Sequence, residues 1–134
     1  MAKNSNTRKM RDVSKGDVLY AIKKDAPADG ISERLVEGTG IAPSGEMYLE
    51  LAGGCGWDYI PKSSMSKTYI SIYDSVIATS REELLKAAEK VIRRSLEKTD
   101  NSIKDAYHTL EIMKKRKDSL LSMIKELDKN HKNP

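Results

Sequence analysis

Glycine and proline are confined almost entirely to the first part of this 134-residue chain. All eight glycines lie within residues 16–56, and three of the four prolines lie within residues 27–61, whereas residues 81–131 contain neither. Because Gly and Pro mark turns and interrupt helices, we expect a turn-rich module of short strands followed by a helical arm. The sequence therefore predicts an α+β protein: a small antiparallel β module, either an SH3-like barrel or a meander, followed by a long helical or coiled-coil arm.

Alternating apolar and polar residues predict the strands of the β module. Residues 17–24 place Val18, Tyr20 and Ile22 on one face, and residues 46–52 alternate in the same way, which is typical of a half-buried strand. Strands are expected at residues 17–24, 33–42, 46–52, 56–60 and 67–73.

The helical arm is expected to begin at Ser80, because Ser80 and Glu83 have the S-x-x-E spacing of a capping box. The polar run at 99–102 leaves two alternatives open, one long helix or two helices broken at that run. The expected domains are a flexible basic tail at 1–12, the β module at 13–79, the helical arm at 80–129 and a polar tail at 130–134.

The second half of the arm carries a heptad pattern. Eight positions follow alternating spacings of three and four, and only Lys117 among them is charged. A charged residue in such a seam costs stability but can fix register and oligomeric state. We expect self-association through this arm; the alternative is a surface helix packed on its neighbour. The seam consists of Ile103, Ala106, Leu110, Met113, Lys117, Leu120, Ile124 and Leu127.

The composition restricts both the class of protein and its location. Hydrophobic residues make up 38% of the chain and Phe is absent, so an oligomer is expected to complete the core. No apolar run approaches the roughly 18 residues of a membrane helix, and the basic N-terminus lacks the apolar stretch of a secretory signal. A lone cysteine fits a reducing compartment. The expected location is the cytoplasm, without membrane contact.

Charge is distributed unevenly along the chain, whose net charge is +4. Basic residues exceed acidic ones in residues 1–24 and 81–134, and acidic residues exceed basic ones in residues 25–80. Contacts with polyanions, including nucleic acid, are therefore expected at the two ends.

The stretch LELAGGCGWDYIP (49–61) is the one candidate for a catalytic loop. Gly56 is followed by Trp57 and Asp58 rather than by the Lys-Ser/Thr of a phosphate-binding loop, and the third glycine of a dinucleotide fingerprint is missing. Cys55 would need a neighbouring base to act as a nucleophile, and the two histidines lie far along the chain, His108 in the arm and His131 in the polar tail. We interpret the stretch as a turn beside a packed tryptophan and assign no catalytic residue and no cofactor.

A possible calcium loop at residues 25–33 also fails. Pro27 occupies the third ligand position and Val36 the twelfth, and strands rather than helices flank the segment. We assign no metal.

Basic side chains of the arm are the remaining candidates for binding. Lys114, Lys115, Arg116 and Lys117 occupy consecutive helical positions, and Arg93 and Arg94 form a second group. An arginine can hold a phosphate through two hydrogen bonds. The alternative is a solvated helix face compensated by nearby acids.

Aromatic side chains offer a second kind of contact. Trp57, Tyr59, Tyr69 and Tyr73 have the chemistry to stack on nucleobases. The interpretation favoured by the sequence is instead that they fill the core of a β module without Phe.

The stretch YDSVIATSREELLKAAEKV (73–91), a last strand ending in T-S-R-E-E and running into a helix, resembles small accessory proteins of bacteriophages. The layout over residues 13–128 is similar to that of the Thoeris anti-defence sponges. This resemblance implies a β core that is joined to two long helices and oligomerises. It also implies pockets between protomers that capture a cyclic ADP-ribose-type signal with arginines and an aromatic ring, and location in the host cytoplasm.

Together these observations predict a non-catalytic oligomeric protein that sequesters a small anionic nucleotide-like ligand. Ligand-binding residues are expected among Arg93, Arg94, Arg116, Lys114, Lys115, Trp57 and Tyr59. The alternatives are a protein-interaction module that inhibits a host enzyme and a nucleic-acid-binding accessory protein.

Overall fold

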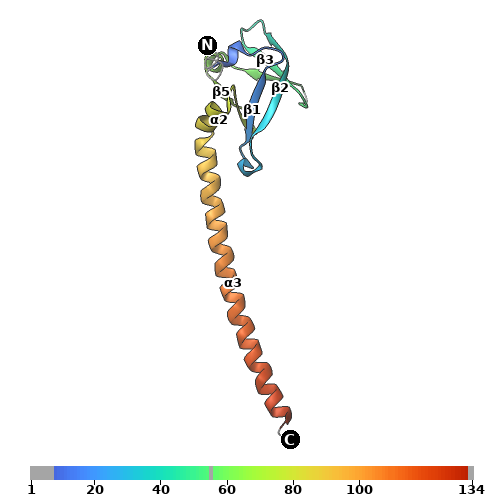
Figure 1. Cartoon of the computed structure of the whole chain (residues 1–134), viewed down its shortest axis with the longest axis vertical. Helices are drawn as coiled ribbons and strands as arrows, with labels where there is room; N and C mark the ends of the chain where they lie inside the picture. The colour runs from blue at the N-terminus through green and yellow to red at the C-terminus, as the bar shows by residue number, and fades with distance from the viewer. Residues whose placement is uncertain (1–7, 55, 133–134) are drawn as a thin grey trace. The chain divides into compact units, whose positions relative to one another are not determined.

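The computed structural model describes residues 8–54 and 56–132 (Figure 1). The chain divides into two units, Met1–Ser95 and Leu96–Pro134. The elements in chain order are η2 (Met10–Asp12), β1 (Val18–Lys23), η3 (Pro27–Asp29), β2 (Ser32–Ile41), β3 (Met47–Leu51), β4 (Trp57–Ile60), α1 (Lys62–Met65), β5 (Tyr69–Ser71), β6 (Ser75–Ala78), α2 (Arg81–Ala87) and α3 (Glu89–Lys132).

The six strands form one antiparallel sheet that curls into a near-closed barrel. The strand order is β4-β3-β2-β1-β6-β5, so β4 and β5 are the end strands. Neighbouring strands pair in register, for example Ala21 with Ile77 and Tyr48 with Tyr59. The predicted α+β architecture, a small antiparallel β barrel followed by a long helix, is therefore confirmed.

The barrel interior is filled by aliphatic side chains from every strand. On β3, Met47, Leu49 and Leu51 are all buried, as the alternation of that strand predicts. Leu19 and Ala21 of β1 point into the same interior. The members of this core are Met10, Val13, Leu19, Ala21, Val36, Met47, Leu49, Leu51, Ile60, Ile70 and Ile77.

A second, smaller core lies outside the barrel, where α2 covers β1 and β6. Leu84 of α2 is fully buried against Ile22 and Val76, with Tyr20 at the edge of the cluster. The face of β1 that carries Val18, Tyr20 and Ile22 is therefore the one outside the barrel. The reason is that β1 is covered on both sides, by the barrel interior and by α2, so alternation alone does not tell the faces apart.

Residues 67–73, predicted as one strand, end in a hairpin. The strand β5 stops at Ser71, the Ile72 N–H donates to the Ser75 carbonyl at 2.9 Å, and β6 returns from Ser75 to Ala78. The stretch SVIA is the last strand before the T-S-R-E-E sequence, and it supplies a central position of the sheet rather than an edge.

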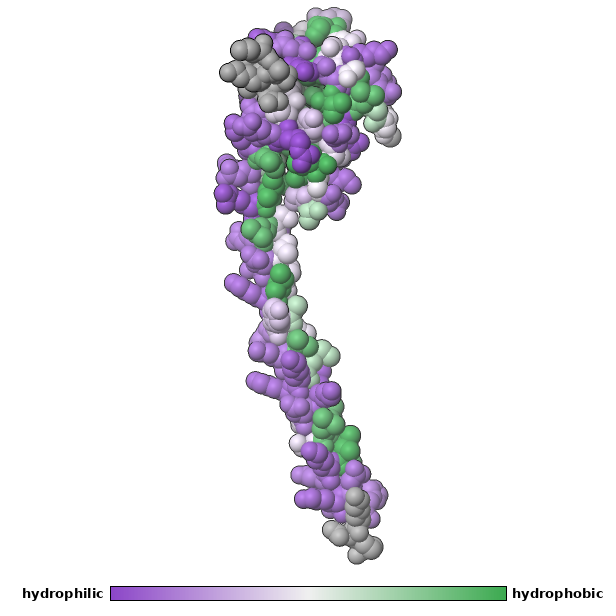
Figure 2. All heavy atoms as spheres, viewed as in Figure 1, coloured by the Kyte–Doolittle hydropathy of each residue, from purple (hydrophilic) through white to green (hydrophobic). Residues whose placement is uncertain are grey.

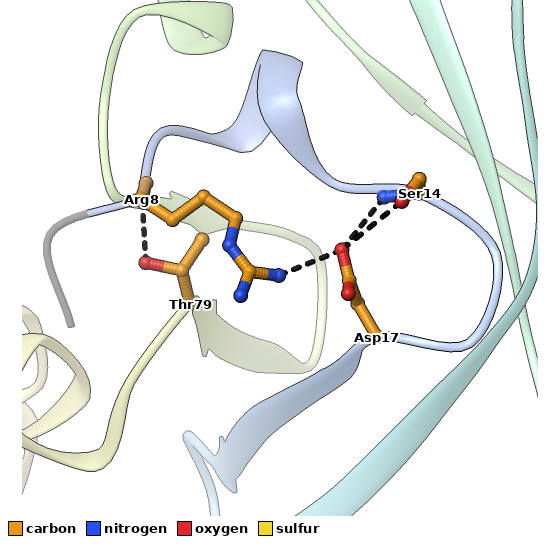
Figure 3. Close-up of polar contacts among 4 residues, drawn as sticks. All are labelled: Arg8, Ser14, Asp17 and Thr79. Atoms are coloured by element: carbon orange, nitrogen blue, oxygen red, sulfur yellow. Dashed lines mark hydrogen bonds and ion pairs between the residues drawn. The ribbon is translucent and has the colours of Figure 1, made fainter. Parts of the chain in front are cut away.

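The part of the N-terminal stretch that the structure describes is folded onto the barrel, so the prediction of a flexible tail is wrong for residues 8–12. Met10 is fully buried, and its N–H donates to the Lys67 carbonyl at 2.8 Å. Figure 3 shows that Thr79 Oγ1 donates to the Arg8 carbonyl at 2.6 Å, while the Arg8 guanidinium lies 2.7 Å from Asp17 Oδ2. Residues 1–7 lie outside the described residues.

The helical part begins where the capping sequence predicts. Ser80 Oγ accepts a hydrogen bond from the Glu83 N–H at 3.1 Å, which satisfies one of the free donors of the first turn of α2. Ala88 separates α2 from α3, yet the Ile92 N–H still donates to the Ala88 carbonyl at 2.9 Å. The backbone therefore stays helical in its hydrogen bonding across this position.

The helix α3 continues through residues 99–102 without interruption and ends at Lys132. The alternative of two helices broken at 99–102 is thus wrong, and residues 130–132 of the expected polar tail are helical. Runs of good helix formers without Gly or Pro explain this continuity.

Candidate functional site

Three aromatic side chains lie together on the outer face of β3 and β4. The strand pairing places Tyr48 opposite Tyr59, and Glu50 opposite Trp57. Directly paired residues share a face of a sheet, and this face is the opposite of the one that buries Leu49. We name the group formed by Tyr48, Trp57 and Tyr59 the aromatic surface.

The rings of the aromatic surface contact one another edge to face. The Tyr48 and Trp57 ring centroids are 5.0 Å apart with an interplanar angle of 85°, and those of Tyr48 and Tyr59 are 6.2 Å apart at 68°. Such T-shaped pairs are favourable arrangements of aromatic quadrupoles. Tyr48 is thus the central ring and restrains the other two.

The outer rings of the aromatic surface remain open to solvent. Trp57 is 46% exposed and Tyr59 is 65% exposed, and Tyr73, in the β5–β6 turn, is fully exposed. The interpretation that these aromatic side chains fill the core is therefore wrong for all three. Aliphatic residues fill the barrel instead, and Tyr69 alone of the four packs at the edge of the α2 core.

Two glycines of β2 form the floor beneath the aromatic surface. Gly38 pairs with Glu50 and Gly40 pairs with Tyr48. A Cβ built on Gly40 would lie 2.6 Å from two ring carbons of Tyr48, and a Cβ built on Gly38 would lie 3.0 Å from Cη2 of Trp57. The rings of Tyr48 and Trp57 therefore pack directly against the backbone of β2, and 46% of Trp57 remains exposed.

The immediate charge next to the aromatic surface is negative. Glu50 shares its outer face, and Glu50 Oε1 lies 3.6 Å from the Cβ position built on Gly38. A carboxylate accepts hydrogen bonds from N–H groups and repels phosphate. The arrangement suits a planar ring that stacks on Trp57 and carries an N–H donor at its edge.

The glycine-rich stretch before β4 is a turn, as predicted, for the residues that the structure describes. The Gly54 N–H donates to the Leu51 carbonyl at 3.1 Å, and Gly53 has a φ of 78°, a left-handed conformation that glycine adopts without strain. Cys55 lies outside the described residues. The turn presents Trp57 at the surface rather than packing it.

The predicted arginines of the first unit lie on α3 and are exposed. Arg93 Nε lies 2.9 Å from Glu89 Oε2, one helical turn earlier, so its charge is already partly compensated. Among the described residues, no hydrogen bond, ion pair or ring contact joins Arg93 or Arg94 to Trp57 or Tyr59. The structure of one chain does not bring these predicted residues together.

The other predicted basic residues, Lys114, Lys115 and Arg116, belong to the second unit and are all exposed. Consecutive residues point about 100° apart around a helix. In the heptad defined by the seam, Lys114 and Arg116 flank the seam on its two sides, whereas Lys115 lies on the opposite side of the helix. Within the second unit, the basic residues therefore surround the helix and form no pocket.

The apolar seam of α3 is uncovered in the structure of one chain. Its large side chains are each about half exposed, from 47% for Leu110 to 56% for Met113 and Leu127. Figure 2 shows hydrophobic side chains along α3 beside hydrophilic ones on the face in view. Contiguous exposed apolar residues of this kind are a common feature of interaction surfaces, and the seam is therefore a candidate for one.

A polar hollow of about 480 Å³ lies beside the N-terminal segment, lined by residues that include Arg8, Asp17, Thr79 and Glu82. The Arg8 guanidinium and the Asp17 carboxylate already pair with each other (Figure 3), and Asp17 Oδ2 also accepts a hydrogen bond from the Ser14 N–H at 2.8 Å. These groups hold the N-terminal segment in place, so we assign the hollow no ligand.

Residues 8–54 and 56–132 contain neither a cluster of metal-ligating side chains nor a membrane-spanning helix. No three side chains of His, Cys, Asp or Glu converge there on a common point that could hold a metal ion. No described helix is both long enough and apolar enough to cross a membrane.

Comparison with protein-family models, with curated proteins and with solved structures finds no match to this chain. The function is therefore argued from the aromatic surface and the seam themselves.

Proposed function

We propose that this chain is a non-catalytic binding protein that self-associates through α3 and sequesters a small nucleotide-like ligand. The observation that carries the proposal is the aromatic surface, in which a half-exposed Trp57 is fixed by Tyr48 and the floor of Gly38. The restrained ring of Trp57 keeps about half of its surface open to solvent, and this open surface is available to a planar ligand.

Stacking supplies the affinity for the base. A nucleobase on an aromatic side chain contributes about 1–3 kcal/mol, and less ordering entropy is lost when the ring is already held in place. Tyr48 and the glycine floor provide that restraint. Bound ligand would then be withdrawn from its receptor by mass action, and no bond would be broken.

The phosphates of such a ligand need cations that the aromatic surface lacks. Glu50 disfavours phosphate beside Trp57, so the phosphates would point away from it. The candidates are Lys114, Lys115 and Arg116, supplied by another copy after assembly. The cyclic ADP-ribose-type signals implied by the resemblance of residues 73–91 combine these two requirements, a base and phosphates.

Calorimetric titration of the full chain with ADP-ribose tests this site. Trp57→Ala and Tyr59→Ala should each lower affinity by about fivefold to a hundredfold, which corresponds to the loss of one stacking contact. Tyr73→Ala removes a fully exposed ring outside the aromatic surface and should leave affinity unchanged. Equal losses in all three variants, or none, would contradict the proposal.

A protein partner is the second candidate, and Glu50 beside Trp57 is the observation that favours it. Trp and Tyr dominate the energetics of protein interfaces, and a carboxylate beside them suits a basic peptide better than a phosphate. This partner would bind wild-type protein and lose affinity both in Trp57→Ala and in Glu50→Gln. A stacked nucleotide would lose affinity in Trp57→Ala but little in Glu50→Gln, because the glutamine carbonyl oxygen can still accept a hydrogen bond from the N–H donor of the base.

Single-stranded nucleic acid also stacks on aromatic rings, and salt separates it from the small ligand. Its affinity should fall steeply as salt rises, because each phosphate contact releases counterions. A single nucleotide makes few such contacts, so its affinity should change little over the same range.

A further inference from the structure

The seam of α3 extends toward the N-terminus of the second unit by the same spacing of three and four, through Thr99 to Leu96. Leu96 is 61% exposed and Ile103 48%. Within residues 96–127, all but two seam positions are apolar, and the exceptions are Thr99 and Lys117. The placement of these two residues determines which partner the seam can accept.

A parallel pair of identical helices places each seam residue opposite its own copy. Lys117 would then face Lys117 across the seam, with two like charges in the least hydrated part of the interface. The flanking positions would not compensate for this, because Lys114 would lie near Thr109 and Asp100 near Ser95 of the second copy. A parallel dimer therefore conflicts with the charge pattern.

An antiparallel pair removes this conflict in one particular register. We propose that α3 binds a second copy of the chain antiparallel, with Lys117 of each copy opposite Thr99 of the other. A step forward on one helix is then a step back on its partner, so the remaining layers follow. They are Met113 opposite Ile103, Leu110 opposite Ala106 and Leu120 opposite Leu96, each occurring twice.

In this register the two polar seam positions, Thr99 and Lys117, face each other, and all remaining layers within residues 96–120 are apolar. The largest size difference is also complementary, because the small Ala106 faces Leu110. The paired stretch, residues 96–120, lies wholly within the second unit, where the seam side chains are exposed.

Charge complementarity supports the same register. Asp100 directly follows Thr99, so it flanks the seam beside Lys114 and Lys117 of the second copy. Each dimer thereby gains two such clusters of opposite charge at the edge of the interface, where the ammonium groups can remain hydrated. Lys117, the one cation in the seam, thereby fixes the antiparallel orientation of the two helices.

Neighbouring antiparallel registers lose this match. A shift of one heptad in either direction moves Lys117 opposite Ala106 or Ile92, and Thr99 opposite Ile124 or Leu110. Each shift sets a charge against an apolar residue and separates Lys114 from Asp100. Among these three registers, only the proposed one places Lys117 opposite a polar residue and brings Asp100 of one copy next to Lys114 of the other.

The inference rests on the self-association in the proposed function but not on its ligand. The first test uses full chains in which Cys55 is replaced by Ser and which carry either Ile103→Cys or Met113→Cys, with tags of different mass. After mixing and mild oxidation, the proposal predicts a disulfide that joins position 103 of one chain to position 113 of the other. Neither variant alone should cross-link, because facing Cα atoms must lie within about 7 Å.

Two results would overturn the register. Cross-linking of Ile103→Cys with itself would show a parallel pair, and no cross-linking in the mixture of helical, folded chains would show that these positions do not meet. Titration of the same samples with ADP-ribose reports on the aromatic surface separately, so failure of the register and failure of the ligand site are distinguishable.

A charge exchange provides a second test without cysteine. Lys114→Glu should weaken association about tenfold, because it sets like charges together at both ends of the dimer. The double variant with Asp100→Lys should restore wild-type association, measured by sedimentation equilibrium. Lys115→Glu makes the same change of charge on the opposite side of the helix and should leave association unchanged. An equal loss in both single variants, or no restoration, would also overturn the register.

Discussion

The ring of Tyr48 covers Gly40 so closely that a Cβ built on this glycine would lie 2.6 Å from two of the ring carbons. Tyr48 is also the ring that Trp57 and Tyr59 contact. The backbone of β2 is therefore coupled through one side chain to the whole aromatic surface.

Gly40→Ala is expected to destabilise the chain by about 1–3 kcal/mol, the usual range for overpacking, because the Tyr48 ring must move. Tyr48→Ala removes the obstruction, so the double variant should lose much less than the two single losses combined. Urea unfolding of the four proteins measures this coupling. Gly38→Ala is the matched control, since the half-exposed Trp57 can yield, and its cost should be smaller. Additive losses at Gly40 and Tyr48 would contradict the described contact.

Met10 tests whether the N-terminal segment belongs to the barrel. Its side chain is fully buried in the core, so Met10→Ala should lower the free energy of unfolding by about 2–5 kcal/mol. Lys9→Ala changes an exposed neighbour and should cost little. Equal, small effects of the two substitutions on the denaturant midpoint would contradict the packing of residues 8–12 on the barrel and would indicate a flexible tail.

Asp17 is expected to matter more for stability than the arginine it pairs with. Its Oδ2 accepts from the Ser14 N–H and also contacts Arg8 (Figure 3). Asp17→Ala should therefore cost about 1–2 kcal/mol. Arg8→Ala should cost about 1 kcal/mol or less, because the ion pair is partly solvated and the Arg8 carbonyl still accepts from Thr79. Thermal or urea unfolding distinguishes the two, and the reverse order would contradict this account.

Lys117→Leu should strengthen self-association and weaken its specificity. Burying an additional leucine contributes about 1.5–3 kcal/mol, which corresponds to roughly a tenfold or greater gain in affinity. Without the lysine, parallel and shifted arrangements become accessible, so sedimentation should show tighter but mixed assemblies. Unchanged affinity in this variant would mean that Lys117 lies outside the interface.

The sequence predicts the architecture well because each half has one dominant local signal. The absence of Gly and Pro from residues 81–131 predicts the helical part, and the capping pair Ser80 and Glu83 predicts where it starts. The sequence left open a break at 99–102, and α3 runs through this stretch because polar residues alone do not end a helix when no Gly or Pro accompanies them.

The site was predicted less completely, because burial depends on tertiary pairing. Trp57 and Tyr59 were named as candidates for ligand binding but were expected in the core, which aliphatic residues fill instead. Tyr48, Gly38 and Gly40 were missed. The alternation of two glycines in residues 38–40 was the available signal, because small residues on one face of a strand make room for large rings on its neighbours.

The outward face of β1 illustrates the same limit. Val18, Tyr20 and Ile22 alternate correctly, yet the barrel interior receives Leu19 and Ala21. Both faces of β1 are covered, the inner one by the barrel core and the outer one by α2, so alternation alone does not tell which face is the inner one.

The central claim, that the aromatic surface binds a nucleobase, is most directly tested by the emission of Trp57. This residue is the only tryptophan of the chain, so its fluorescence reports on the surface without labelling. The account predicts a saturable change in emission on titration with ADP-ribose or AMP, and none with ribose 5-phosphate, which lacks a base. Emission that responds to none of these compounds, or equally to ribose 5-phosphate, would contradict it.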